Sequence, residues 1–114
     1  MDIKKINDEI DDFVSERDWE KYHKPKNLVM ALSGEVGELN ECFQWLDDED
    51  IEEVKNNSEK IVPIENEIAD IFIYLVRIAN KMDIDIEDAV YKKIALNKLK
   101  YPIDENQGVV NKTA

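Results

Sequence analysis

Two short stretches, Gly34-Glu35-Val36-Gly37-Glu38-Leu39 and Glu67-Ile68-Ala69-Asp70, place carboxylates where a helix of this chain otherwise carries apolar side chains. On a helix that advances about 100° per residue, Glu35 lies at the centre of one apolar stripe and Glu38 lies inside its edge. Glu67 and Asp70 repeat this pattern on a second stripe. The stripes consist of Leu28, Leu32, Leu39, Cys42 and Leu46 in one helix and of Ile64, Ile71, Ile78 and Met82 in the other. Unpaired buried charge is costly and like charges one turn apart repel each other, so the pattern predicts a bound cation.

Apolar residues at helical spacing around these stretches predict an all-α fold. We expect helices at residues 3–17, 25–46 and 63–82, and a fourth from an N-cap at Asp85 to Lys100. Residues 47–60 are polar and acidic, and form a connector with room for a short helix around residues 51–54. No segment shows the alternation typical of β-strands. The predicted architecture is a four-helix bundle or similar helical domain over residues 1–102, followed by a C-terminal tail, residues 103–114.

The composition is that of a globular protein without affinity for nucleic acid. Hydrophobic residues make up 43% of the 114 residues, and only 3 Gly and 3 Pro interrupt them, which favours long helices. The net charge of −12 repels phosphate backbones. No stretch approaches the ~20 apolar residues of a membrane span, and Met1-Asp2-Ile3-Lys4-Lys5 lacks the apolar core of a signal peptide. We therefore expect a cytoplasmic protein that binds neither a membrane nor nucleic acid.

The middle of the third predicted helix, Ile71-Phe72-Ile73-Tyr74-Leu75-Val76, is apolar on nearly every side. Such a helix is usually buried on all sides. In a chain this short, one of its faces is expected to be covered by a partner subunit.

Residues three apart on a helix are neighbours, so Glu35 with Glu38, and Glu67 with Asp70, each form a pair of carboxylates. If the second and third helices pack antiparallel, the two pairs can face each other. Four carboxylates without histidine favour Mg²⁺ or Mn²⁺ over Zn²⁺, and Mg²⁺ is commonly bound together with substrate phosphates. A di-iron site normally needs Glu-x-x-His on two helices, and the one histidine, His23, lies outside the pairs. The alternative is that these acids are solvated residues of a very acidic protein.

An ordered set of motifs resembles the dCTP pyrophosphatase branch of the MazG-like family, a group of all-α nucleoside triphosphate pyrophosphohydrolases. The family binds Mg²⁺ through a Glu-Glu-x-x-Glu and Glu-x-x-Asp signature, and this chain has Gly34 at the first Glu, a departure that looks shared with that branch. The motifs are Glu16-Arg17-Asp18-Trp19, His23, Pro25, Asn27-Leu28, Ala31-Leu32, Gly34 to Leu39, Phe43-Gln44-Trp45, Glu67-Ile68-Ala69-Asp70, Ile73-Tyr74-Leu75, Lys93, Asn97 and Tyr101-Pro102.

The resemblance implies hydrolysis of a dNTP to dNMP and pyrophosphate by a homotetramer built as a dimer of dimers. It implies Mg²⁺ on Glu35, Glu38, Glu67 and Asp70. Glu35 or Glu38 would be the base that activates water, and Glu35 is favoured because it lies deepest in its stripe. The resemblance also makes substrate-binding candidates of Trp19, His23, Trp45, Tyr74, Lys93, Asn97, Lys100 and Tyr101. For the aromatic residues among them, ordinary core packing is the alternative.

Three functions therefore stay open at the level of sequence. The first is a pyrophosphohydrolase acting on dCTP or a modified dCTP in nucleotide-pool housekeeping. The second is the same chemistry on dUTP or another noncanonical nucleotide. The third is a noncatalytic helical module in which a metal ion only stabilises the assembly.

Overall fold

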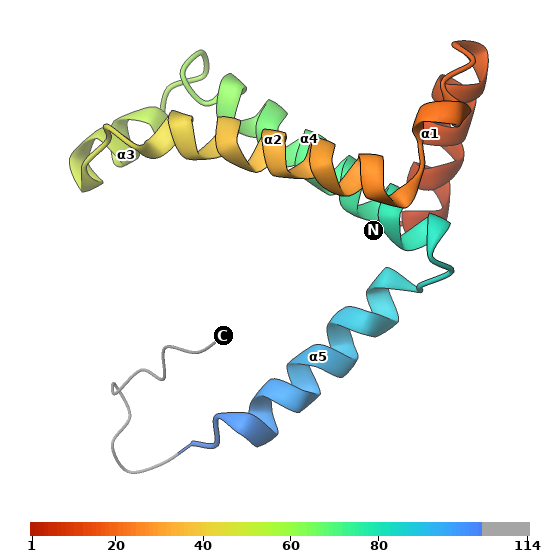
Figure 1. Ribbon diagram of the computed structural model, residues 1–114. Coiled ribbons are helices and arrows are strands. Elements are labelled where there is room, and N and C mark those ends of the chain that lie inside the picture. Colours follow the sequence, from red (N-terminus) through yellow and green to blue (C-terminus); the bar gives the residue numbers. More distant parts are fainter. Residues whose placement is uncertain (104–114) are drawn as a thin grey trace. The chain divides into compact units, whose positions relative to one another are not determined.

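The computed structural model describes residues 1–103, and all regular elements in this part of the chain are helices (Figure 1). The all-α prediction is confirmed. None of the helices described is long and apolar enough to cross a membrane. Residues 104–114 of the predicted tail lie outside the described residues. The elements are α1 (Ile3–Glu16), the 3₁₀ helix η1 (Glu20–Tyr22), α2 (Pro25–Phe43), α3 (Asp48–Lys55), α4 (Val62–Lys81) and α5 (Ile86–Lys100).

The chain divides into two compact units, Met1–Ile84 and a second unit that begins at Asp85 and contains α5. The predicted domain boundary at residue 102 is not tested by this division and stays a prediction. Asp85 caps α5 as predicted, because its Oδ1 accepts a hydrogen bond from the Asp88 backbone N–H at 3.0 Å.

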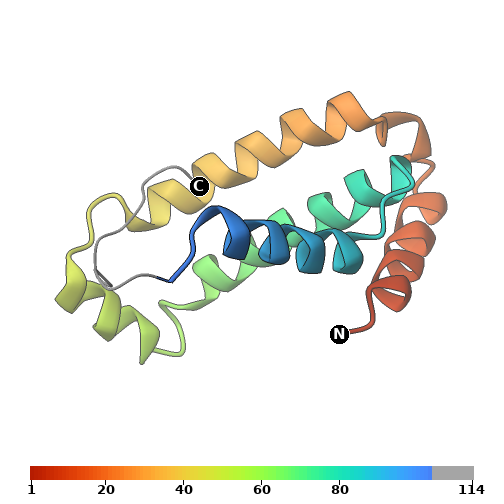
Figure 2. The same cartoon turned by 90° about the horizontal axis from the view of Figure 1, so that it is seen from below.

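The first unit is built on an antiparallel pair, α2 and α4, which lie side by side and run in opposite directions (Figure 2). Both helices begin with a proline in their first turn, where the missing N–H costs no helical hydrogen bond. Leu28 of α2 and Ile64, Val76 and Ala79 of α4 are buried. This pairing brings Glu35 and Glu38 of one predicted carboxylate pair close to Glu67 of the other.

Helix α1 packs against α4 at the end of the pair where α2 begins and α4 ends, as both ribbon views show (Figures 1 and 2). Its Val14 is 1% exposed. Asp2 caps the helix by accepting the Lys5 backbone N–H at 3.0 Å. The helix therefore closes one end of the α2–α4 pair with an apolar face.

Helix α3 begins three residues earlier than the connector prediction of residues 51–54. Its start is a capping box in which Asp47 Oδ1 accepts the Asp50 N–H at 2.9 Å and Asp50 Oδ2 accepts the Asp47 N–H at 3.1 Å. The three acidic residues of the first turn are favoured by the positive end of the helix dipole. The acidic run thus promotes a helix here.

Several apolar side chains of α4 are not covered within the first unit. Ile68, Ile73 and Leu75 are all more than one-third exposed. The expectation that a partner subunit covers one face of α4 and the oligomeric state both stay predictions.

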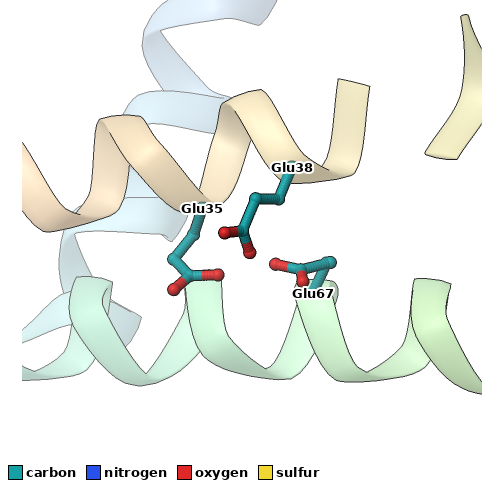
Figure 3. A group of neighbouring side chains, drawn as sticks. All are labelled: Glu35, Glu38 and Glu67. Atoms are coloured by element: carbon teal, nitrogen blue, oxygen red, sulfur yellow. The ribbon is translucent and has the colours of Figure 1, made fainter. Parts of the chain in front are cut away.

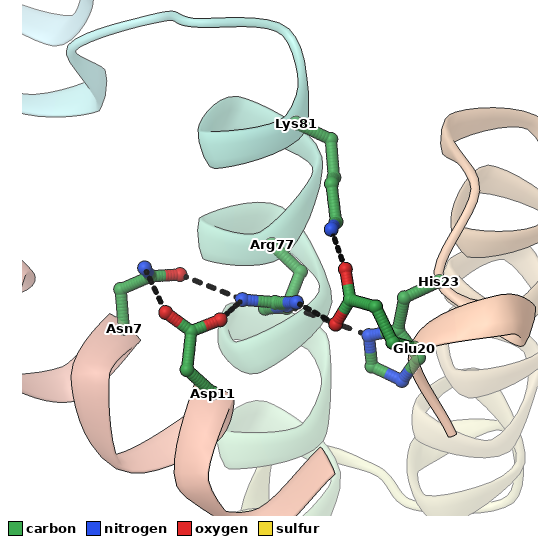
Figure 4. A network of polar contacts seen from close by, with 6 residues as sticks. All are labelled: Asn7, Asp11, Glu20, His23, Arg77 and Lys81. Carbon is green, nitrogen blue, oxygen red and sulfur yellow. Dashed lines mark hydrogen bonds and ion pairs between the residues drawn. The ribbon is translucent and has the colours of Figure 1, made fainter. Parts of the chain in front are cut away.

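A fully buried arginine joins α4 to α1 and η1 (Figure 4). Arg77 Nη1 donates to Asp11 Oδ1 at 2.5 Å and to Asn7 Oδ1 at 3.2 Å. Its Nη2 donates to Glu20 Oε2 at 3.4 Å, and Glu20 also pairs with Lys81. Hydrogen bonding to Lys81 is the main cause that lowers the pKa of Glu20. The network thus connects segments more than 50 residues apart in the sequence.

Arg77→Ala is expected to lower the free energy of unfolding by about 3 kcal/mol, because it leaves a cavity and removes the shared cation of Asp11 and Glu20. Both carboxylates are about half exposed and can rehydrate, which keeps the loss from being larger. The control is Lys55→Ala, which removes an exposed pair with Glu52 and should cost under about 1 kcal/mol. Urea unfolding at one fixed protein concentration measures both, and equal losses would contradict the structural role of Arg77.

Candidate active site

Three of the predicted metal ligands meet at the α2–α4 interface (Figure 3). Glu35 and Glu38 extend from α2 and Glu67 extends from α4, and one oxygen of each lies within 4.8 Å of the others. The antiparallel packing of the two helices, which was the condition for the two pairs to face each other, produces this meeting. Asp70, the fourth predicted ligand, is not in this group and lies one turn further along α4.

The carboxylate group, Glu35, Glu38 and Glu67, is electrostatically unbalanced. The Oε2 atoms of Glu35 and Glu67 are buried and have no hydrogen-bond partner among the described residues. The neighbouring Glu35 carboxylate, then loss of hydration, then Glu38 raise the pKa of Glu67 to about 7. Three close carboxylates with two orphaned oxygens could hold a metal ion, because a cation would both neutralise them and satisfy the free oxygens.

A cavity of about 490 Å³ adjoins this group within the first unit. Glu35 and Asp70 line it, which places Asp70 beside the carboxylate group even though it is not part of it. The rest of the lining is largely apolar, with few polar groups, as in many small-molecule sites. The other lining residues are Ile6, Glu9, Ile10, Phe13, Val14, Trp19, His23, Ile73 and Tyr74.

Three of the predicted substrate-binding residues, Trp19, His23 and Tyr74, are among the residues that line this cavity. The Trp19 ring packs edge-on against Phe13, with ring centroids 5.7 Å apart. Burial, followed by the charges of Glu35 and Asp70, raises the pKa of the Tyr74 hydroxyl. Residues distant in the sequence thus form a pocket with aromatic walls and carboxylates at one side.

The other predicted substrate-binding residues are not brought to this cavity within the first unit. Trp45 follows the end of α2, is 85% exposed and does not line the cavity. Lys93, Asn97 and Lys100 lie on α5, and Tyr101 is its C-cap, so all four belong to the second unit. Their roles stay predictions.

Two contributions to the site were not predicted from the sequence. One is the wall that α1 supplies through Ile6, Glu9, Ile10 and Phe13, where only a helix over residues 3–17 was predicted. The other is the contact of Arg77 with His23, whose Nδ1 lies 3.4 Å from the Arg77 Nε. The α1 pattern indicates a buried face, but a helix face that lines a cavity has the same spacing as one that packs in a core.

A family model described as MazG-like matches residues 30–113, most of the chain. The chain belongs to the MazG-like family. It is 40% identical to dCTP pyrophosphatase 1 of Bos taurus over 107 residues, 94% of this chain and 62% of that protein. It is also 40% identical to dCTP pyrophosphatase 1 of Homo sapiens over 101 residues, 89% of this chain and 58% of the relative. The chain therefore spans about three-fifths of the length of these curated relatives.

A solved structure agrees with the assignment to the MazG-like family. The crystal structure of a pyrophosphatase from Archaeoglobus fulgidus is similar, with a TM-score of 0.77 and 38% identity, covering 88% of this chain and 92% of that one. The resemblance stated from the motifs is thereby confirmed at the level of family and fold.

The raised pKa of Glu67 predicts how the stability of the metal-free protein depends on pH. Between its ordinary pKa of 4.5 and about 7, the unfolded chain releases a proton that folded Glu67 retains, so this residue makes stability fall as pH rises. The difference in unfolding midpoint between wild type and Glu67→Gln, measured in EDTA, isolates this effect from the other titrating groups. We expect the unfolding midpoint of the variant to rise relative to that of the wild type as the pH increases from 4.5 to 7. A difference in midpoint that does not change with pH would contradict the raised pKa of Glu67.

Proposed function

We propose that this chain is a Mg²⁺-dependent nucleoside triphosphate pyrophosphohydrolase that converts dCTP or a modified dCTP to the monophosphate and pyrophosphate. The observation that carries the proposal is that Glu35 belongs both to the carboxylate group and to the lining of the aromatic-walled cavity. A triphosphate held by the carboxylate group through a cation would thus have its base within reach of that cavity. The names of the relatives support the choice of dCTP.

The chemistry of the ligands supports Mg²⁺ as the ion. Glu35, Glu38 and Glu67 would hold it, with Asp70 beside them, and all donors are hard carboxylate oxygens without histidine or cysteine. When bound, the ion would neutralise the phosphate charge and lower the pKa of a coordinated water. Mn²⁺ is the natural substitute for the same ligand set.

The residues of the chain have distinct roles in the proposed reaction. Water attacks the α-phosphorus, the bond to the bridging oxygen of the β-phosphate breaks, and pyrophosphate leaves. Glu35 is the proposed base that accepts the proton of this water, because its Oε2 is buried and has no partner among the described residues. Glu38, which is more exposed, is the second candidate.

The remaining predicted contacts complete the proposal. Trp19 and Tyr74 offer aromatic surfaces on which the base can stack within the cavity. Lys93, Asn97, Lys100 and Tyr101 of the second unit are proposed to contact phosphate or sugar in a cytoplasmic homotetramer. Trp45 is proposed to stack on a base only within that assembly, because its side chain is exposed in the described chain.

A panel of nucleoside triphosphates tests the proposed activity, with pyrophosphate release measured in Mg²⁺ and in EDTA. We expect dCTP or a modified dCTP to have the highest kcat/KM, and EDTA to abolish turnover. A highest kcat/KM on dUTP or a damaged nucleotide would assign the same reaction to a different substrate. If no nucleotide of the panel is cleaved but Mg²⁺ still raises the thermal stability of the protein, the noncatalytic module is favoured.

Glu38→Gln is expected to lower kcat at least about 100-fold while leaving the helical circular dichroism spectrum unchanged, because it removes one charge of the carboxylate group. The same substitution should raise the thermal midpoint in EDTA, since one like-charge repulsion is relieved. The matched control is Glu41→Gln, one turn further along α2 and outside the group. It should keep activity within about twofold, and full activity of Glu38→Gln would remove this residue from the site.

A further inference from the structure

We propose that Arg77 is a positioning residue, which fixes His23 as its Nε2–H tautomer and so makes His23 a hydrogen-bond donor to the base in the cavity. The inference rests on the proposed function, because it requires that the cavity receives a nucleotide base. The proposal assigns a role to the polar network around Arg77, which lies outside the carboxylate group (Figure 4).

The Arg77 guanidinium is held in one orientation. Its side chain is 0% exposed, and each of its three nitrogens has a partner. Asp11 and Asn7 of α1 accept from Nη1, and Glu20 of η1 accepts from Nη2. Because a guanidinium is planar, partners at its two ends fix the direction of the Nε–H, which faces His23 Nδ1 at 3.4 Å.

This contact determines which ring nitrogen of His23 carries the proton. A guanidinium has only donors, so the nitrogen that faces it must act as an acceptor. A neutral imidazole has one donor and one acceptor, which places the proton on Nε2. An imidazolium would set two donors and two positive charges against each other. Burial, followed by the charge of Arg77, accordingly lowers the pKa of His23.

The donor that results is available to a ligand. His23 lines the cavity together with Trp19 and Tyr74. Its Nε2 lies on the opposite edge of the ring from Arg77 and has no hydrogen-bond partner among the described residues. A pyrimidine such as cytosine carries ring-nitrogen and carbonyl acceptors, so a fixed Nε2–H can select its orientation. Arg77 has its nitrogens engaged by protein groups and acts through His23.

The tautomer can be measured directly, because the chain has one histidine. Long-range ¹H–¹⁵N correlation spectra of the full ¹⁵N-labelled protein, at a pH where the ring is neutral, should show the proton on Nε2. In Arg77→Met, a share of the Nδ1–H form should appear, since the cation is gone and the Glu20 carboxylate lies nearby. A proton on Nδ1 in the wild type, or an unchanged tautomer in Arg77→Met, would overturn the proposal.

Substitutions of His23 test recognition even if Arg77→Met does not fold. His23→Gln keeps an N–H donor at nearly the same distance from the backbone, whereas His23→Leu removes it. Titration calorimetry with Mg²⁺ should show an about tenfold weaker Kd for dCMP in His23→Leu and a change within about threefold in His23→Gln. The Kd for pyrophosphate, which has no base, should change in neither.

The outcomes of the titration separate the two proposals. An unchanged dCMP affinity in His23→Leu, equal weakening of dCMP and pyrophosphate, or no dCMP binding by the wild type would overturn the role of His23 in base recognition. The proposed hydrolysis fails separately, if no nucleotide of the panel releases pyrophosphate.

Discussion

Mutual repulsion among three carboxylates is the constraint on which the arrangement of the first unit depends. The antiparallel pairing of α2 and α4 is the element of the fold that forces Glu35, Glu38 and Glu67 to within 4.8 Å of one another. Burial of a few apolar side chains along the same interface must outweigh that repulsion in the metal-free chain. One carboxyl of the group therefore retains its proton to near neutral pH, and an external cation is the alternative means of balancing the charge.

Helix α4 carries two ionic clusters whose charges are balanced differently. Arg77 follows Glu67 by ten residues, about 15 Å along the helix axis. At Arg77 the chain supplies both signs itself, with Asp11 and Glu20 around one guanidinium. At Glu67 it supplies only negative charge among the described residues of the group. Asp70 and Tyr74, which lie between Glu67 and Arg77 in the sequence of α4, are part of the cavity wall.

The extent to which the sequence predicted this structure follows from the range of each interaction. The four long helices of the described chain and the proximity of Glu35, Glu38 and Glu67 were predictable, because helical spacing is local and a charge in an apolar stripe is visible without a fold. The 3₁₀ helix η1 was not predicted. The start of α3 was missed, since its capping box uses Asp50 where the common pattern has Glu or Gln. Arg77 was not among the predicted site residues. Its partners could not be named, because they lie 54 to 70 residues away.

The contrast between the two clusters also explains why one can act as a site and the other as its support. A cluster whose charges are internally paired gains little from a further ion and resists rearrangement, so it suits a group that must hold a neighbour in place. A cluster of one sign is unfavourable until something of the opposite sign arrives, so its unfavourable energy in the free protein becomes affinity for a cation. Each cluster has one residue on α4, Arg77 in the first and Glu67 in the second. His23, which contacts Arg77 of the first cluster, and Glu35 of the second cluster line the same cavity.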